Sequence, residues 1–114
     1  MMLTLPWPQR VLSPNARCHW AVKARSAKAY RYECFVLAGL AKLRVDWDGP
    51  IHLHIGFYPP SNRGRDLDNC IASIKNGLDG LADALKVNDS RFHISAVLGL
   101  KRAGGEVIVA IGKV

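Results

Sequence analysis

The sequence predicts an α+β domain of order β-α-β-α-β-β, with one mixed four-stranded sheet and two helices packed on one face. Two stretches carry apolar residues at helical spacing. Between and around them lie stretches in which apolar and polar residues alternate, as in a strand. Proline- and glycine-containing segments separate these stretches. The length of 114 residues suits a single domain, so we assign residues 1–114 to one unit.

The first half of the chain predicts a short strand, a loop and a helix. Residues 3–5 alternate apolar and polar side chains, and Pro6 and Pro8 end this first strand. A loop then runs to about Trp20, and a helix is expected over residues 26–44. Its apolar positions follow the spacing i, i+4, i+7, i+11 and are Tyr30, Cys34, Leu37 and Ala41.

The next two elements are a strand and a second helix. Residues 51–58 alternate, with Ile51, Leu53, Ile55 and Phe57 on one side and His52, His54 and Tyr58 on the other. The second helix is expected over residues 68–85, capped by Asp68 or Asn69. Its apolar stripe consists of Ile71, Ile74, Leu78, Leu81 and Leu85.

Two strands complete the expected fold, at residues 92–100 and 106–114. The glycines of Ala103-Gly104-Gly105 between them are typical of a hairpin turn. We therefore expect these last two strands to pair with each other.

The charge of the chain favours a polyanionic partner. The chain has sixteen Lys and Arg residues and nine Asp and Glu residues, which gives a net charge of +7. Only Glu33 opposes the eight basic residues that precede Asp46. Nucleic acid is the first candidate for a surface of this kind, and a solvated basic face that aids solubility is the alternative.

The cysteines and the apolar runs predict a cytoplasmic protein that neither enters a membrane nor carries a leader. Three widely spaced cysteines form no C-x-x-C pair, which is typical of reduced thiols inside the cell. The longest apolar run covers about residues 35–41 and is too short to span a bilayer. No basic-then-apolar segment opens the chain, so we expect no signal peptide.

The most informative motif is Arg63-Gly64-Arg65-Asp66-Leu67-Asp68-Asn69. Asp66 and Asp68 come two residues apart where a loop leads into the second helix. Paired carboxylates repel each other unless a positive charge lies between them, and hard oxygen ligands suit Mg²⁺. The alternative is an Asx turn with an N-cap, in which Asp66 pairs with Arg65.

Two further residues extend this motif into a candidate site. Lys75 follows Asp68 by seven residues, so on a continuous helix both lie on nearly the same stripe. There Lys75 can stabilise charge on a phosphoryl group, or form an i,i+4 ion pair with Asp79. Asp89 follows the second helix and either completes a carboxylate cluster or is an ordinary turn residue.

These motifs together resemble the RusA family of Holliday junction resolvases, found in bacteria and their phages. The resemblance rests on Arg65-Asp66-Leu67-Asp68-Asn69, Lys75-Asn76-Gly77-Leu78-Asp79-Gly80-Leu81 and Asn88-Asp89-Ser90-Arg91. The opening Leu5-Pro6-Trp7-Pro8 and Pro14-Asn15-Ala16-Arg17 are also similar, so it covers about residues 3 to 112. The chain departs from the family pattern by one additional helical turn before Lys75 and by Asn88, where an aspartate is frequent.

The resemblance implies a homodimeric endodeoxyribonuclease that cuts four-way junctions in recombination and repair. Asp66, Asp68 and Asp89 would bind Mg²⁺, with Mn²⁺ as a substitute, and Lys75 would be the catalytic lysine. No small-molecule cofactor and no membrane partner are expected. The residues expected to contact DNA are Arg10, Asn15, Arg17, Lys23, Arg63, Arg65, Lys101 and Arg102.

Two other readings remain open from the sequence. One is a basic nucleic-acid-binding module without catalytic turnover. The other is a basic assembly protein in which Asp66 and Asp68 serve only as helix caps.

Overall fold

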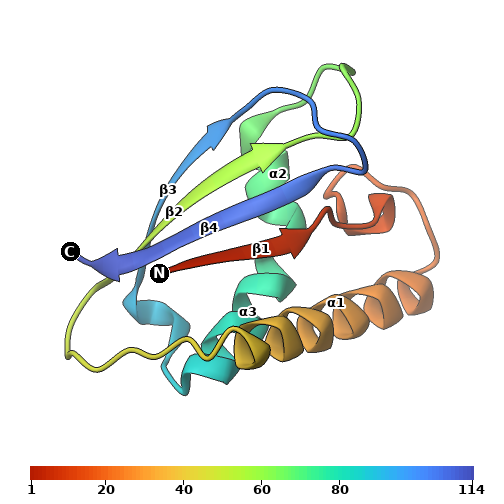
Figure 1. Cartoon of the computed structure of the whole chain (residues 1–114). Coiled ribbons are helices and arrows are strands. Elements are labelled where there is room, and N and C mark those ends of the chain that lie inside the picture. Colours follow the sequence, from red (N-terminus) through yellow and green to blue (C-terminus); the bar gives the residue numbers. More distant parts are fainter.

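The computed structural model describes all residues, 1–114, as a four-stranded sheet with helices on one face (Figure 1). The elements, in chain order, are β1 (Met2–Pro6), η1 (Arg10–Leu12), α1 (Trp20–Leu40), β2 (Ile51–Tyr58), α2 (Leu67–Ser73), α3 (Lys75–Leu85), η2 (Asp89–Arg91), β3 (Phe92–Leu98) and β4 (Glu106–Lys113). This arrangement confirms the predicted α+β class and the order of strands and helices along the chain.

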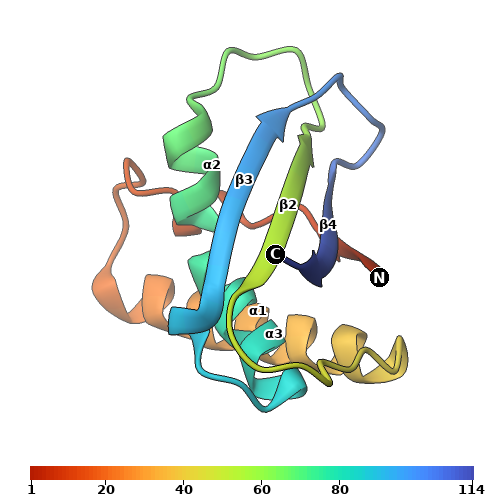
Figure 2. The ribbon, with the colours of Figure 1, turned by 90° about the vertical axis from the view of Figure 1, so that its left-hand side faces the viewer.

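The sheet has the strand order β1-β4-β2-β3 and is mixed. β4 pairs antiparallel with both β1 and β2, whereas β2 and β3 run parallel. Parallel neighbours need a crossover, which α2 and α3 provide between β2 and β3. α2 lies alongside β3, while α1 and α3 pack on each other (Figure 2).

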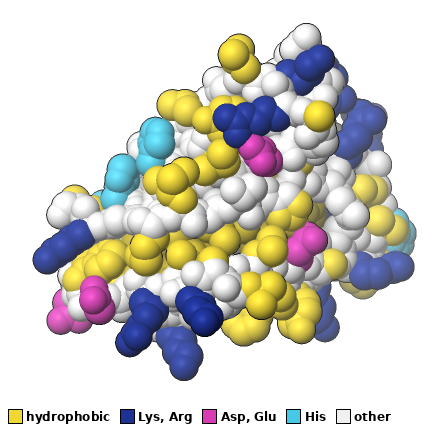
Figure 3. Space-filling view, viewed as in Figure 1, with side chains coloured by type: hydrophobic (Ala, Val, Ile, Leu, Met, Phe, Trp, Pro, Cys, Tyr) yellow, Lys and Arg dark blue, Asp and Glu magenta, His cyan; other side chains and the backbone are white.

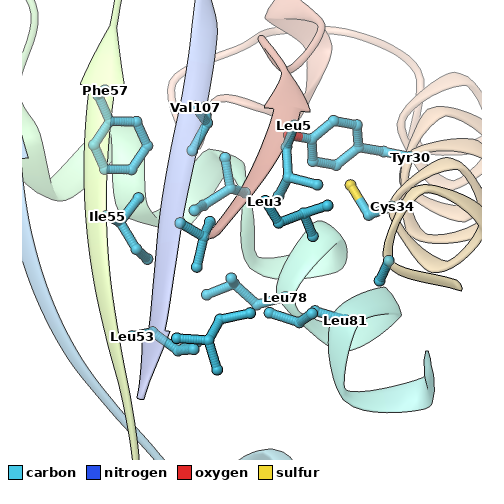
Figure 4. Packing of buried hydrophobic residues seen from close by; sticks show 14 of the residues in the cluster. Leu3, Leu5, Tyr30, Cys34, Leu53, Ile55, Phe57, Leu78, Leu81 and Val107 are labelled. Atoms are coloured by element: carbon cyan, nitrogen blue, oxygen red, sulfur yellow. The ribbon is translucent and has the colours of Figure 1, made fainter. Parts of the chain in front are cut away.

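The core lies between the sheet and the helices (Figure 4). The alternation of β2 is confirmed, because Ile51, Leu53, Ile55 and Phe57 are all fully buried. They meet the buried leucines of α3 and the Tyr30 and Cys34 face of α1. The Tyr30 hydroxyl donates a hydrogen bond of 2.8 Å to the Pro6 carbonyl, which ties α1 to the end of β1.

The helices α1 and α3 approach each other closely at Gly80. A Cβ atom at this position would lie 2.1 Å from the backbone carbonyl oxygen of Arg31, so only glycine fits. Beside this contact, the Arg31 guanidinium forms two hydrogen bonds to the Asp83 carboxylate, at 2.8 and 3.0 Å. The glycine thus sets the distance between two helices that an ion pair also joins.

The prediction for the first helix was wrong at both ends. The helix begins six residues earlier than expected, because the His19 ring caps it by accepting a hydrogen bond of 3.1 Å from the Ala21 N–H. It ends at Leu40, since Lys42 adopts a left-handed backbone with φ of 55°. Tyr30 and Cys34 of the predicted apolar stripe are buried, whereas Ala41 lies beyond the helix end and is exposed.

The single helix predicted over residues 68–85 is two helices, separated at Ile74. Ile74 leaves helical geometry, with φ −102° and ψ 7°. Just before it, the Ser73 hydroxyl donates to the carbonyl of Asn69 at 2.7 Å, a contact that often bends helices. The break means that Asp68 and Lys75 do not share one continuous helical stripe.

The prediction that the last two strands form a hairpin was also wrong. The turn itself is present, with Gly104 and Gly105 at φ of 76° and 70°. However, β2 lies between β3 and β4 in the sheet. Because β3 runs parallel to β2, the chain leaves β3 at the end where β2 also finishes, and β4 returns along the opposite side of β2.

No helix of the structure combines the length and the apolar character needed to cross a bilayer.

Candidate functional site

The two aspartates of the central motif lie at the N-terminus of α2, where both are exposed. Asp66 is the N-cap residue, in place of the predicted Asp68 or Asn69, and its Oδ1 accepts a hydrogen bond of 3.0 Å from the Asp68 N–H. The remaining oxygens of the two side chains form no hydrogen bond and no ion pair within the chain. Two neighbouring carboxylates therefore present free oxygens to solvent.

Arg65 does not pair with Asp66. Its guanidinium donates instead to the carbonyls of Ser61 and Arg63, both at 3.0 Å, and to the Ser61 hydroxyl at 3.2 Å. The same group lies 5.4 Å from the centre of the Trp7 ring. Arg65 thus folds the loop after β2 onto Trp7, and this loop leads directly into the two aspartates.

Lys75, at the start of α3, is held between two carboxylates. Its Nζ lies 2.8 Å from Asp79 Oδ1 and 3.0 Å from Asp89 Oδ2. The hydrogen bonds to Asp79 and then Asp89 raise the pKa of Lys75 above its usual value. In turn, the hydrogen bond from Lys75 lowers the pKa of Asp89. The predicted ion pair with Asp79 is confirmed, and Asp89 joins it.

The expected cluster of Asp66, Asp68 and Asp89 is not formed. No three His, Cys, Asp or Glu side chains lie close enough together to hold one metal ion. The break at Ile74 separates the N-terminus of α2 from α3, and Lys75 engages Asp89. Asp66 and Asp68 alone nevertheless provide two hard ligands, and Mg²⁺ is commonly held by one or two carboxylates together with water and substrate phosphate.

A cleft of about 690 Å³ opens beside Asp66. Its walls come from the segment after β1, which contains η1, and from the loop between β2 and α2. Five of the eight residues expected to contact DNA line it, together with Asp66: Arg10, Asn15, Arg17, Arg63 and Arg65. The fold therefore joins two basic segments that are about fifty residues apart in the sequence.

The other three expected DNA contacts lie outside this cleft. The Lys23 ammonium donates to the Ser13 carbonyl at 3.2 Å and so supports the loop that forms the cleft wall. Lys101 and Arg102 lie in the loop between β3 and β4, where Arg102 forms an ion pair with Glu106. Lys and Arg side chains gather around the end of the molecule at the upper right of Figure 3.

The sequence placed Tyr58 on the polar side of its strand but did not predict its contact with Arg102. The Arg102 guanidinium lies 3.6 Å from the centre of the Tyr58 ring, on the face of β2 opposite to buried Phe57. The signal was present, because a glycine inside a strand, here Gly56, often marks the close approach of another group.

The comparisons with known proteins give a family without an activity. The chain matches no family model. A protein of Xylella fastidiosa (strain Temecula1 / ATCC 700964), described as an uncharacterized protein, is 40% identical over 113 residues, which cover 96% of this chain and 74% of the relative. The chain therefore belongs to the same family as this Xylella fastidiosa protein.

Proposed function

We propose that the protein is a magnesium-dependent, structure-selective DNA endonuclease that cuts Holliday junctions or related branched DNA. The observation that carries this proposal is the basic cleft lined by Asp66, whose neighbour Asp68 also exposes its carboxylate to solvent. The resemblance to the RusA family supports the same reaction. We place this activity in the cytoplasm, as the reduced cysteines suggest.

The cleft would bind the phosphate backbone. Arg10, Arg17 and Arg63 lie on its walls, and none of them forms an ion pair within the chain. Their charge is thus available to phosphates, which Arg contacts through paired N–H groups. Asn15 can add hydrogen bonds to the same backbone.

Asp66 and Asp68 would hold the Mg²⁺ ion, as their free carboxylate oxygens fit its preference for hard ligands. When bound, the ion would polarise a phosphoryl oxygen and lower the pKa of a bound water. The N-cap hydrogen bond from the Asp68 N–H fixes the Asp66 carboxylate in place beforehand. The positive end of α2 also favours negative charge at this point, so the pair is tolerated before any ion binds.

Lys75 would act as a positive charge and not as a base. Because its pKa is raised, it stays protonated at neutral pH and can donate hydrogen bonds to an anionic phosphoryl group. Asp79 and Asp89 would hold the ammonium in position. In this arrangement Asp89 serves the site through Lys75.

A homodimer would present two such sites related by a two-fold axis. A four-way junction offers two strands of like polarity, so paired nicks need two equivalent sites. This expectation rests on the chemistry of the substrate and on the family resemblance.

The direct test is incubation of the purified protein with an end-labelled synthetic four-way junction in Mg²⁺, Mn²⁺ or EDTA. We expect symmetric paired nicks with either metal, none in EDTA, and far less cutting of a linear duplex of the same sequence. Binding to the junction without nicks in any divalent metal would favour the non-catalytic binding module instead.

A further inference from the structure

Tyr58 lies flat on the face of the sheet that no helix covers. A Cβ atom on Gly56 would lie 2.9 Å from Cε2 of the ring, and one on Gly99 would lie 2.6 Å from Cε1. The ring therefore fills the space that side chains would occupy at both positions. The Gly99 N–H donates to the Phe57 carbonyl at 2.7 Å, which holds this second glycine beside the end of β2.

Arg102 covers the other side of the ring. Its Cζ atom is 3.6 Å from the ring centre, which is van der Waals distance, so the planar guanidinium must lie along the ring. An ion pair with Glu106 and a hydrogen bond of 2.9 Å from the Arg102 N–H to the Pro59 carbonyl fix it there. The ring covers one face of the guanidinium, and 46% of the Arg102 side chain stays exposed to solvent.

This stack adjoins the basic cleft. A Cβ atom on Gly105, in the same loop as Arg102, would lie 2.9 Å from Pro60 Cδ and 3.0 Å from Trp7 Cβ. Trp7 and Pro60 both line the cleft. A DNA strand that leaves the cleft at this side would therefore meet the loop that carries Arg102.

We propose that the Tyr58–Arg102 stack is a subsite for an unpaired nucleobase of the DNA substrate, which stacks on the open face of the guanidinium. The Glu106 carboxylate offsets the charge of Arg102, so a phosphate is the weaker candidate, whereas stacking needs only the planar surface. Bases inside a duplex already stack on one another. The subsite would therefore favour branched or partly unpaired DNA, and this inference rests on the DNA-cleaving function proposed above.

The test compares two single-stranded probes of equal charge, a twelve-nucleotide oligothymidylate and a twelve-nucleotide strand of abasic residues. Affinities are measured in EDTA, so that cleavage does not intervene. We expect the natural protein to bind the oligothymidylate about fivefold or more tightly than the abasic strand. Arg102→Lys, which keeps the charge but not the plane, and Tyr58→Leu should both remove this preference.

Arg44→Lys is the matched control, because Arg44 is exposed in the segment before β2, at the opposite end of that strand. It should keep the preference, and thermal unfolding should show that Arg102→Lys is folded. Equal affinity of the natural protein for the two probes, or a preference that survives Arg102→Lys, would overturn the subsite. If the base preference is absent but the junction is cut, the subsite is wrong and the nuclease proposal stands. If the protein prefers the oligothymidylate but cuts no junction, the subsite stands and the nuclease proposal is wrong.

Discussion

The Lys75 ammonium lies 3.0 Å from the Asp89 carboxylate and so joins the first residue of α3 to the first residue of η2. The two residues are fourteen positions apart in the chain. Asp79, one turn along α3, holds the same ammonium from the other side. This ion-pair network holds a protonated lysine between α3 and η2, and Asp89 takes part in it instead of clustering with Asp66 and Asp68.

The contribution of the Asp89–Lys75 ion pair to the free energy of unfolding should depend on pH. The pKa of Asp89 lies below its ordinary value of 3.8, so its contribution is present above that value and is lost as the pH falls through the lowered pKa. Lys75 stays protonated throughout, because its pKa is raised. Urea unfolding of the natural protein and Asp89→Asn should differ at pH 7 in low salt and converge as the pH drops below 3.8. A difference that is the same at both pH values would contradict the pairing.

The charge of Lys75 should matter for the chemical step. Lys75→Met should reduce junction cleavage by about 100-fold, the usual cost of removing one donor to a developing negative charge. Affinity for the junction should change little, because a single exposed lysine is a small part of the basic surface. Single-turnover cleavage and equilibrium binding measure the two effects separately. Lys28→Met, on the exposed side of α1, is the control and should cleave normally.

The close approach of α1 and α3 gives a test of the fold. Gly80→Ala should destabilise the protein by about 3 kcal/mol, because the new methyl group meets the backbone of Arg31 and the helices must separate. Gly39→Ala, also in a helix but with nothing within 4 Å of the added Cβ, should stabilise by about 0.5 kcal/mol. Urea denaturation of both variants measures these changes, and equal effects would show that α1 and α3 are not packed as described.

The cleft arginines should differ in their roles. Arg63→Ala removes a free charge, so the slope of log affinity against log salt for duplex DNA should fall in magnitude by about 0.9. Arg65→Ala also removes the hydrogen bonds that fold residues 61–65, so it should weaken binding more than Arg63→Ala does. Binding titrations across a salt series test both. Identical behaviour of the two variants would mean that Arg65 has no structural role in the loop.

The fold class followed from patterns that local packing enforces. The alternation from Ile51 to Phe57 predicted a strand buried on one side, and each of its apolar residues is indeed buried. The break at Ile74 was not predicted because the apolar stripe continues through it, and the Ser73 hydrogen bond beside it leaves that stripe unchanged. The pairing of β4 with β2 instead of β3 was not predicted, because the glycines indicate where the chain turns but not which strand lies beside the next one.

The structure brings some of the predicted site residues together and separates others. The spacing of Asp66 and Asp68 indicated a carboxylate pair, and the structure places both at one helix end. That Asp89 would join Lys75 depends on how α3 sits against η2, which sequence spacing does not encode. The meeting of Arg10 and Arg63 in one cleft likewise depends on two loops far apart in the chain.

The central claim is that the exposed carboxylates beside the cleft carry out DNA cleavage, and Asp68→Asn tests it most directly. This variant keeps the backbone N–H of residue 68, which donates to the N-cap residue Asp66, so the start of α2 should be preserved. Asp48→Asn, in the exposed turn before β2, is the matched control. We predict that Asp68→Asn loses Mg²⁺-dependent nicking of a four-way junction while binding it as tightly as before or more tightly, and that Asp48→Asn cleaves normally. Nicking by Asp68→Asn at the rate of the control would contradict the account.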